Sequence, residues 1–434
     1  MKELDARVGL VGQLLQSDVC ALFYRLAQEL PGEQVILNLG REKLLVCQDF
    51  GSLHRVLREN PGNFHKNFAA FTTYFGQSRL TADGEQWRQL QKVGQPLIAQ
   101  VEGKEILRET RSCYGNAAER ILEVADASPI LTVDPFIDHA AASVVMATVL
   151  GVDISDISPE FYRSLRRVLN FCGEASMRVY DSTLRIENNE VAELESAYQK
   201  VRQTIGPFIV RAKAAGRGNE NLERFYAAYT SDSDLFGEVS TLLFAGFDTT
   251  ASTLCWALML LANKPSLQRQ LRTELREVSA GEGVSEELAL NSPTLEALIN
   301  ETFRMFPPVP ILSRIAVGED LVGETRIESG QKVLLSIIGL HHDRNFWVEP
   351  SRLRIDRFSG GEMGSDLRRH FAPFSSGPRM CGGSKFALTE LSVAIAVLLR
   401  DIQFDPVDQQ PVRFQWGASM RHRDGVKLAV SRAA

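Results

Sequence analysis

The segment that leads up to Pro265 is apolar on nearly all of its faces, and no other feature of the chain constrains the fold as strongly. Ser231 and Asp234 supply helix-capping side chains before LFGEVSTLLFAGFDTTASTLCWALMLLANKP. Such a helix normally crosses the middle of a large protein. Its longest uninterrupted apolar run, Leu254–Ala262, is far shorter than the roughly 20 residues that span a membrane. The pattern predicts a protein built around one buried central helix.

The composition is that of one large globular domain. The 434 residues are 44% hydrophobic, and no repeat or Pro/Gly/Ser-rich linker divides them, so we expect a single domain over residues 1–434. A net charge of −6 offers no positive field for nucleic acid. The six cysteines contain no CxxC pair, and the N-terminus does not resemble a secretion signal. We expect a soluble, cytoplasmic protein without a membrane anchor.

Hydrophobic periodicity predicts a mainly α fold with small β-sheets. The extended segments are Gln34–Cys47 and Leu321–Ile338, so about residues 1–80 and 321–338 should contribute the sheets. Amphipathic helices are expected around Asp18–Leu30, Phe50–Asn60, Val101–Val124, Glu195–Ala215 and Phe386–Arg400.

The centre of the apolar helix holds poor helix formers, namely Gly246, Asp248, Thr249 and Thr250. Threonine hydroxyls can bond back to the carbonyl four residues earlier and merely bend a helix. A functional groove at a local distortion is equally compatible with these residues. The sequence leaves both interpretations open.

A second helix starts near Ser292 and is ended by Pro307-Pro308. It carries Glu301 and Arg304, which lie on one face because they are three residues apart. Such pairs occur by chance in many helices and usually form solvated surface contacts.

A third segment places Cys381 after a turn-rich loop and directly before Gly382-Gly383 and an amphipathic helix. A helix N-terminus favours a thiolate over a thiol, and Arg379 adds positive charge beside it. A buried structural cysteine would leave the surrounding glycines and arginine unexplained.

The loop Phe374–Gly383 (FSSGPRMCGG) resembles the FxxGxRxCxG heme-binding loop of the cytochrome P-450 superfamily. Ala245–Thr250 is similar to the oxygen-activation motif of that family, and Glu301–Arg304 to its ExxR pair, in the same order. The likeness runs from about Thr81 to the C-terminus, and a soluble, bacterial-type member is expected. Four further signals agree: FPP at 306–308, Arg314, the stretch HHDRNFWVEPSRLRIDRF and Trp87.

The resemblance implies a b-type heme (iron protoporphyrin IX) between the central helix and the helix that follows Cys381. Cys381 would be the metal ligand, an axial thiolate that donates electron density to iron. Phe374 would shield the sulfur, and backbone amides near Gly383 would hydrogen-bond it.

The resemblance also assigns residues that hold the heme and its surroundings. Arg379, Arg314 and Trp87 would bind the propionates. Many relatives have a basic residue four positions after the tryptophan, but here that position is Gln91, which Arg88 or Lys92 would have to replace. Glu301, Arg304 and Arg357 resemble a buried triad, although Leu353–Phe358 lacks the first Phe and the Pro of the FxPxRF pattern.

On the opposite side of the heme, the resemblance makes Thr249 and Asp248 the catalytic residues. Thr249 would interrupt the helix and hold water or dioxygen, Asp248 would feed protons, and Gly246 would leave room over the iron. Substrate contacts would come from aromatic and apolar residues, each of which could equally be ordinary core. These are Phe64, Phe68, Phe71, Tyr74, Phe75, Val309–Leu312, Phe414 and Trp416.

The implied activity is that of a monooxygenase of secondary metabolism, which inserts one oxygen atom of O2 into an apolar organic substrate by hydroxylation or epoxidation. No reductase module fits after the heme loop, so a ferredoxin or flavodoxin with its NAD(P)H reductase is expected. Its docking site would be the basic group Arg368, Arg369, His370, Arg379 and Lys385, unless this is a solvated loop. The alternatives are a heme-thiolate enzyme that does not reduce O2 (a peroxide-driven oxygenase, dehydratase or isomerase) and a non-catalytic heme sensor.

Overall fold

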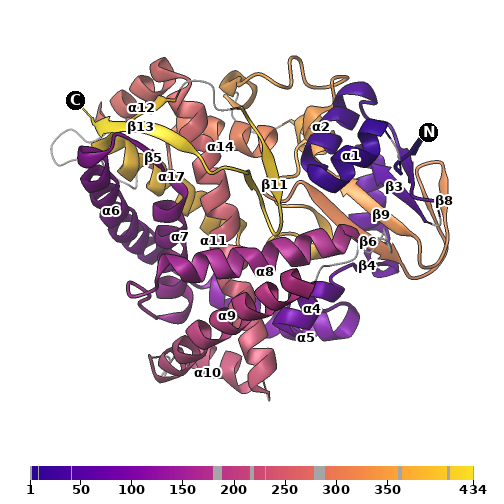
Figure 1. Ribbon diagram of the computed structural model, residues 1–434, viewed down its shortest axis with the longest axis horizontal. Coiled ribbons are helices and arrows are strands. Elements are labelled where there is room, and N and C mark those ends of the chain that lie inside the picture. Colours follow the sequence, from indigo (N-terminus) through magenta and orange to yellow (C-terminus); the bar gives the residue numbers. More distant parts are fainter. Residues whose placement is uncertain are drawn as a thin grey trace.

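A computed structural model describes residues 2–433 except 8, 41, 179–187, 216–218, 230, 278–288, 360–363 and 408–410. Helices make up most of the molecule, and the strands gather mainly on the side that carries the N-terminus (Figure 1). The prediction of a mainly helical fold with small sheets is confirmed.

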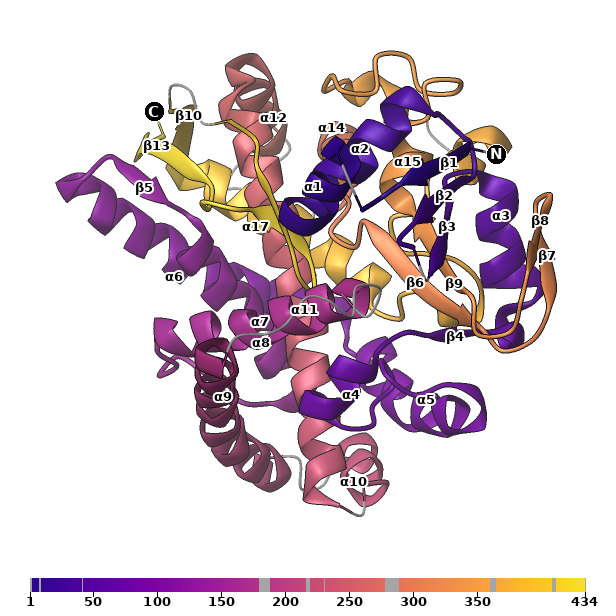
Figure 2. The same cartoon turned by 45° about the vertical axis from the view of Figure 1, so that its right-hand side comes forward.

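Helix α11 (Asp232–Ala262) passes through the middle of the molecule, as Figure 2 shows. It packs against α7 (Asp134–Leu150), α14 (Pro293–Met305) and α17 (Ser384–Asp401). Within the described residues it is the one helix long and apolar enough to cross a membrane, and 83% of its most apolar window is buried inside the protein. The helix is continuous, so the expected interruption at Thr249 is wrong.

The remaining helices surround this centre. The α-helices are α1 (Gly9–Ser17), α2 (Val19–Glu29), α3 (Phe50–His54), α4 (Ala69–Phe75), α5 (Gly84–Ala99), α6 (Gly103–Ala127), α8 (Pro159–Arg178), α9 (Asn188–Ala215), α10 (Glu220–Ala227), α12 (Pro265–Glu277), α15 (Ile337–His342) and α16 (Ser365–His370). A π-helix, η1 (Arg55–Glu59), extends α3, and short 3-10 helices occur at η2 (Pro61–Asn63), η3 (Ile355–Phe358) and η4 (Gly377–Arg379).

The largest sheet has six strands in the order β1-β2-β3-β9-β6-β4. They are β1 (Lys2–Asp5), β2 (Val35–Asn38), β3 (Lys43–Cys47), β9 (Lys332–Ser336), β6 (Ile311–Ala316) and β4 (Phe64–Lys66). Antiparallel pairing of β4 with β6 sets Lys66 opposite Arg314, a register that matters for the site.

Three smaller sheets occur in the part of the chain that the structure describes. One has the order β10-β13-β5, and the other two pair β11 with β12 and β7 with β8. Their bounds are β5 (Ile130–Thr132), β7 (Asp320–Val322), β8 (Thr325–Ile327), β10 (Ile402–Pro406), β11 (Phe414–Trp416), β12 (Met420–His422) and β13 (Lys427–Arg432).

Sequence analysis singled out α2, α6, α9, α11, α14 and α17 but missed α5, α7, α8 and α12. Helix α7 is buried on nearly every side, so its sequence DPFIDHAAASVVMATVL carries little of the alternation that marks an amphipathic helix. Residues 64–75, which hold five of the aromatic residues expected to contact substrate, form β4 and α4 with a short connection.

Candidate active site

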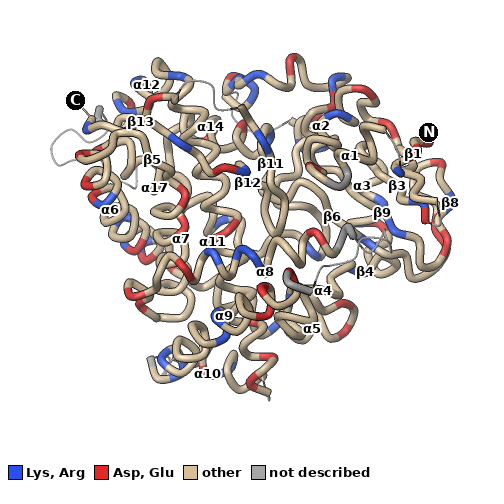
Figure 3. Tube along the Cα trace, viewed as in Figure 1, with Lys and Arg blue, Asp and Glu red and all other residues tan. Residues whose placement is uncertain are grey.

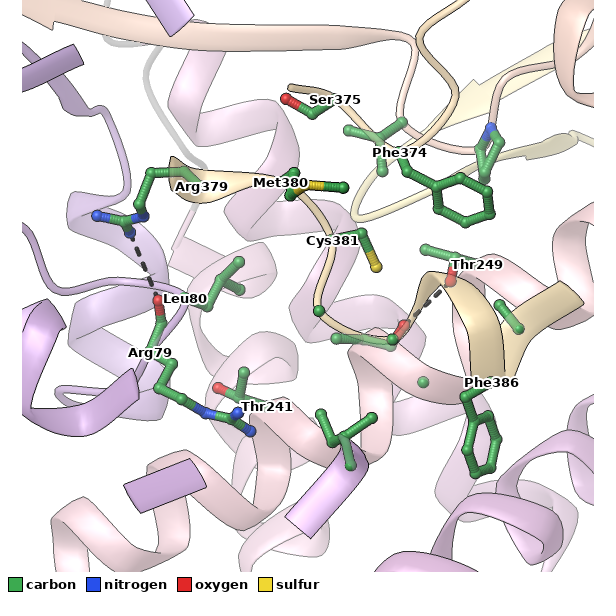
Figure 4. Close-up of a pocket in the computed structure, with 18 of the residues that line it drawn as sticks. Arg79, Leu80, Thr241, Thr249, Phe374, Ser375, Arg379, Met380, Cys381 and Phe386 are labelled. Atoms are coloured by element: carbon green, nitrogen blue, oxygen red, sulfur yellow. Dashed lines mark hydrogen bonds between the residues drawn. The ribbon is translucent and has the colours of Figure 1, made fainter. Parts of the chain in front are cut away.

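A cavity of about 370 Å³ lies between α11, α5, β6 and the loop before α17. Figure 4 shows Cys381, Thr249, Phe374 and Arg379 among the residues around it. In the middle of α11, where most residues are buried, Ala245 is exposed and Thr249 is half-exposed because both face this cavity. The volume is within the roughly 300–1,000 Å³ of ligand and cofactor sites.

The thiol of Cys381 faces the cavity from its loop. The Cys381 backbone N–H donates to the Phe374 carbonyl over 3.0 Å, which closes the loop just before α17. Burial raises the pKa of the Cys381 thiol, whereas a hydrogen bond from the Gly383 backbone lowers it. Burial and this backbone bond thus act in opposite directions on the thiol, and a bound metal would favour its deprotonated form.

Close packing fixes the shape of this loop. Gly377 has φ of +75°, and a Cβ there would lie 1.9 Å from the Leu57 carbonyl oxygen. A Cβ on Gly382 would lie 2.1 Å from Oε1 of Gln95 in α5. The Phe374 ring meets Phe303 edge-on at 5.2 Å. Gly377 is thus required by the neighbouring backbone, whereas the flexible end of Gln95 could move away from a Cβ on Gly382.

Four cationic side chains line the cavity: Arg79, which pairs with the buried Glu238, and Arg379, Arg314 and Lys66. Arg379 donates to Asp83 over 2.9 Å, and its guanidinium lies 4.4 Å from the centre of the Trp87 ring. Burial lowers the pKa of Arg379, and burial together with Arg379 lowers the pKa of Arg314 to about 10. Burial, Arg379 and Arg314 also hold the pKa of Lys66 well below its ordinary value.

Lys66 is a site residue that sequence reasoning missed. Gln91 lines the cavity and donates to Gln95 over 3.1 Å, but Arg88 and Lys92 are exposed and lie outside the lining. No local signal marks Lys66, because it reaches the cavity through the pairing of β4 with β6, whose strands are far apart in the sequence.

The threonines of α11 bond back to their own helix. The hydroxyl of Thr249 donates to the Ala245 carbonyl over 3.0 Å, and that of Thr250 donates to the Gly246 carbonyl over 2.9 Å. Gly246 lines the cavity with its backbone, but a Cβ there would lie 2.7 Å from Val145 of α7. The glycine therefore lets two helices approach closely.

Asp248 lies on a different side of α11 from Thr249, and the structure does not bring it to the cavity. It is buried and accepts hydrogen bonds from Ser419 over 2.5 Å and from Arg421 over 2.7 Å. Arg421 also lies 3.0 Å from a carboxylate oxygen of Asp138 and 3.9 Å from one of Asp134. The acid and the alcohol of the motif thus have separate surroundings.

The structure brings Glu301, Arg304 and Arg357 together. Arg304 donates twice to Glu301, over 2.7 and 2.8 Å, and neither side chain is exposed. Arg357 reaches Glu301 at 3.3 Å from η3 even though the segment lacks the usual Phe and Pro. The pair is therefore a buried one rather than a solvated surface contact.

His341 was also missed, and it ties this triad to the cysteine loop. Its Nε2 accepts the Ala372 backbone N–H over 2.9 Å, and its Nδ1 contacts the Phe303 carbonyl at 3.2 Å. Burial and the neighbouring Arg304 lower the pKa of His341 to about 3, so the ring is neutral and can accept one hydrogen bond while donating the other.

The candidate substrate contacts divide into two groups. Phe68, Val309 and Leu312 line the cavity. The others lie outside the lining and pack in the interior: Phe64, Phe71, Tyr74, Phe75, Pro310, Ile311, Phe414 and Trp416.

The residues around the cavity fit a heme. They offer one thiol from a glycine-rich loop, an apolar helix face opposite it, and three cations at the edge for two carboxylates. Among the described residues, no group of three or more His, Cys, Asp or Glu side chains could hold a metal ion by itself. These side chains fit an iron that is held by a porphyrin and by a single protein ligand, the Cys381 thiolate.

Comparisons with known proteins give a consistent result. A family model described as Cytochrome P450 matches residues 6–430. Cytokinin hydroxylase of Arabidopsis thaliana is 25% identical over 76% of this chain and 67% of that protein. Protein LUTEIN DEFICIENT 5, chloroplastic, from the same plant, is 23% identical over 91% of this chain and 71% of its own length.

Among solved structures, the crystal structure of CYP175A1 from Thermus thermophillus is similar in fold. It has a TM-score of 0.73 and 21% sequence identity, and the match covers 99% of this chain and 100% of that one.

Proposed function

Because the chain belongs to the cytochrome P450 family, we propose that it hydroxylates or epoxidises an apolar organic substrate with one oxygen atom of O2. The broader class follows from the family: a monooxygenase with a b-type heme, which takes electrons from a redox partner and binds an organic substrate and O2. The observation that carries the proposal is that Cys381 and Thr249 line the same largely apolar cavity.

In this proposal the chain holds the heme from three sides. Cys381 ligates the iron while the Phe374 ring limits access of water to the sulfur. Arg379 and Arg314, with Trp87 beneath Arg379, meet the propionates at the cavity edge. When bound, the heme supplies the metal centre at which O2 is activated. Phe68, Val309 and Leu312 exclude water and position the substrate.

Thr249 and Asp248 have distinct tasks in proton supply. The Thr249 hydroxyl, which donates its hydrogen to Ala245, keeps lone pairs that can accept a hydrogen bond from a water in the cavity. Asp248 can pass a proton to that water only after its carboxylate leaves Ser419 and Arg421 and takes up a proton from solvent. We therefore propose Thr249 as the group that positions water and Asp248 as a proton donor that must first be released.

The redox partner that we propose is an acidic ferredoxin or flavodoxin with its NAD(P)H reductase. Arg368 and Arg369 of α16 and Lys385 of α17 are exposed on segments that flank the cysteine loop. Arg379 points inward to Asp83 and would not take part in docking. Charges of both signs are interspersed along the rest of the chain (Figure 3), so docking would depend on this local group.

The alternative function is that of a heme-thiolate enzyme that does not reduce O2. This alternative is favoured by the position of Asp248, which Arg421 holds outside the cavity. Product formation with reductase, partner and NAD(P)H should exceed that with peroxide alone. If peroxide alone supports full turnover and the reductase adds nothing, the alternative holds.

Cys381→Ser tests the site directly. We expect this variant to lose the strongly red-shifted Soret band of the ferrous carbon monoxide complex, because a serine oxygen replaces the thiolate. Cys113→Ser in α6 is the matched control and should keep the band, since Cys113 lies outside the cavity lining. Retention of the band in Cys381→Ser would remove Cys381 as the ligand.

A further inference from the structure

A buried ion pair joins the loop before α5 to the N-terminal part of α11. The Nε of Arg79 donates to Oε1 of Glu238 over 2.5 Å, and the Arg79 backbone N–H donates to Oε2 over 2.8 Å. The Glu238 side chain is fully buried, and that of Arg79 is 10% exposed. One residue thus occupies both oxygens of the carboxylate, and the pair as a whole carries no net charge.

The pair uses only one edge of the Arg79 guanidinium. Among the described residues, the two terminal nitrogens of Arg79 have no hydrogen-bond partner, and the residue lines the cavity. A guanidinium presents its N–H donors in a fixed fork, so those on the terminal nitrogens stay available. Because buried donors are nearly always paired in folded proteins, this end of the cavity calls for an acceptor from outside the chain.

Helix α5 restricts where the guanidinium can lie. A Cβ on Gly94 would lie 2.4 Å from Nε and 2.5 Å from Cζ of Arg79, so the guanidinium packs directly on the backbone of α5. Glu238 holds it from the side of α11. These two contacts preorganise the terminal nitrogens, which lowers the cost of binding a ligand there.

A hydroxyl lies at the same end of the cavity. Thr241 lines the cavity one turn after Glu238 on α11, and Figure 4 shows the Arg79 side chain pointing toward it. The Thr241 hydroxyl donates its hydrogen to the Ser78 hydroxyl over 3.0 Å, so it keeps lone pairs that can accept a bond. Donors from Arg79 and an acceptor from Thr241 therefore meet in a largely apolar cavity.

We propose that Arg79 and Thr241 bind a neutral oxygen, a hydroxyl or a carbonyl group, at one end of an otherwise apolar substrate. The inference rests on the proposed function and narrows its substrate class. Glu238 already balances the charge of Arg79, so a substrate carboxylate would bring an uncompensated charge into a buried place. A neutral oxygen needs no counter-charge, and a hydroxyl can also donate to Thr241.

The position of these residues on α11 determines which end of the substrate is oxidised. Thr241 precedes Thr249 by just over two turns, or about 12 Å at a rise of about 1.5 Å per residue. In the proposed function, Thr249 lies beside the reacting end of the substrate. Oxidation is therefore expected at the end remote from the bound oxygen.

The test measures the affinity of the holoenzyme for imidazoles, which ligate a heme iron and so anchor one end of each probe. The probes are 1-dodecylimidazole and the same molecule with a terminal hydroxyl, methyl ketone or carboxylate, and the shift of the Soret band gives each Kd. The hydroxyl or the ketone should bind at least about tenfold tighter than the unsubstituted chain and the carboxylate. The tighter of the two identifies the oxygen group. The same groups on a propyl chain, which is too short to reach Arg79, should show no preference.

Three variants assign this preference to the guanidinium. Arg79→Lys keeps a cation for Glu238 but removes the forked donors, and it should abolish the preference. Gly94→Ala should weaken it, because the new Cβ displaces the guanidinium. The matched control is Arg88→Lys, whose arginine is exposed on α5 outside the cavity lining, and it should keep the wild-type preference.

Equal affinities for the four long-chain probes, no binding of any of them, or tightest binding of the carboxylate would overturn the proposal. An oxygen preference that survives in Arg79→Lys would do the same. If Arg79→Lys yields no holoenzyme, the double variant Arg79→Met/Glu238→Leu is measured instead, since apolar side chains of similar size can replace a buried ion pair. An unchanged preference in the double variant would equally contradict the role of Arg79.

The ferrous carbon monoxide spectrum of the wild type separates this inference from the proposed function. Absence of the thiolate band there contradicts the proposed function itself. Presence of the band together with equal affinities for the long-chain probes contradicts only the binding of a substrate oxygen by Arg79 and Thr241.

Discussion

At the scale of single residues, the site depends on side chains whose surroundings oppose their charged forms. Burial disfavours the thiolate of Cys381 and the cationic forms of Lys66 and Arg314. Each of these groups faces the same cavity. A cofactor that offers a metal to the sulfur and carboxylates to the cations would relieve all three costs, so heme binding and folding should be strongly coupled.

Thr249→Ala should uncouple electron consumption from oxygenation. Without the hydroxyl, the cavity loses the group that accepts a hydrogen bond from water, and we expect several-fold less product for each NAD(P)H consumed, with release of peroxide. The matched control is Thr204→Ala, whose hydroxyl makes the same bond to the carbonyl four residues earlier, over 2.9 Å, on the exposed part of α9. Equal coupling in Thr249→Ala and wild type would show that another group positions the water.

Ser419→Ala tests whether Asp248 must be released. Loss of the 2.5 Å bond from Ser419 should loosen the carboxylate and raise the rate of coupled turnover by up to about tenfold, with little change in KM. In an Asp248→Asn background the same substitution should have no effect on the rate. If Ser419→Ala alters turnover equally in both backgrounds, Asp248 is a structural partner of Arg421 and carries no proton.

At the scale of elements, α14 is joined to η3 and to the cysteine loop by buried polar contacts. Glu301 accepts from Arg304, from Arg357 and from the Arg354 backbone N–H over 3.0 Å. The guanidinium of Arg304 lies 5.3 Å from the centre of the Trp347 ring and also donates to the His341 carbonyl over 3.0 Å. Together with the bond from the Ala372 backbone N–H to His341, these contacts hold η3 and the start of the cysteine loop against α14.

Glu301→Gln should therefore destabilise the whole proximal side. It leaves the buried Arg304 without a counter-charge, at a cost of about 3–5 kcal/mol, and we expect little heme per mole of protein. Glu319→Gln breaks an exposed ion pair with Arg326 and should change the free energy of unfolding by less than about 1 kcal/mol. Chemical unfolding and the heme-to-protein ratio check both variants. Normal heme content in Glu301→Gln would contradict a structural role for the triad.

At the scale of the whole molecule, the central helices enclose a carboxyl group that the active site does not use. Glu390 of α17 is fully buried, and the hydroxyl of Tyr114 in α6 donates to its Oε1 over 3.1 Å. Its Oε2 has no hydrogen-bond partner among the described residues. Burial raises the pKa of Glu390 to about 8, so the folded protein keeps a proton there that the unfolded chain releases.

Stability should accordingly decrease as pH rises from the unfolded pKa of about 4.5 to the folded pKa of about 8. The loss of stability by pH 7 is about 3 kcal/mol. Glu390→Gln should flatten this dependence and raise the unfolding midpoint at pH 8 while changing it little at pH 5. Glu119→Gln, on the exposed side of α6, is the control. Parallel pH profiles for wild type and Glu390→Gln would show that Glu390 is ionised in the folded protein.

The sequence by itself determined the features that depend on local order along the chain. The cysteine loop, the Glu301–Arg304 spacing and the long apolar helix are contiguous patterns. Hydrophobic periodicity therefore predicted a mainly helical fold, and these three motifs carried the resemblance to the heme-thiolate family. Tertiary structure decided which side chains share a space. The pairing of β4 with β6 brought Lys66 to the cavity, and Ser419 and Arg421 held Asp248 away from it. Both results arise from contacts between segments far apart in the chain, and these contacts follow from the packing of the complete fold.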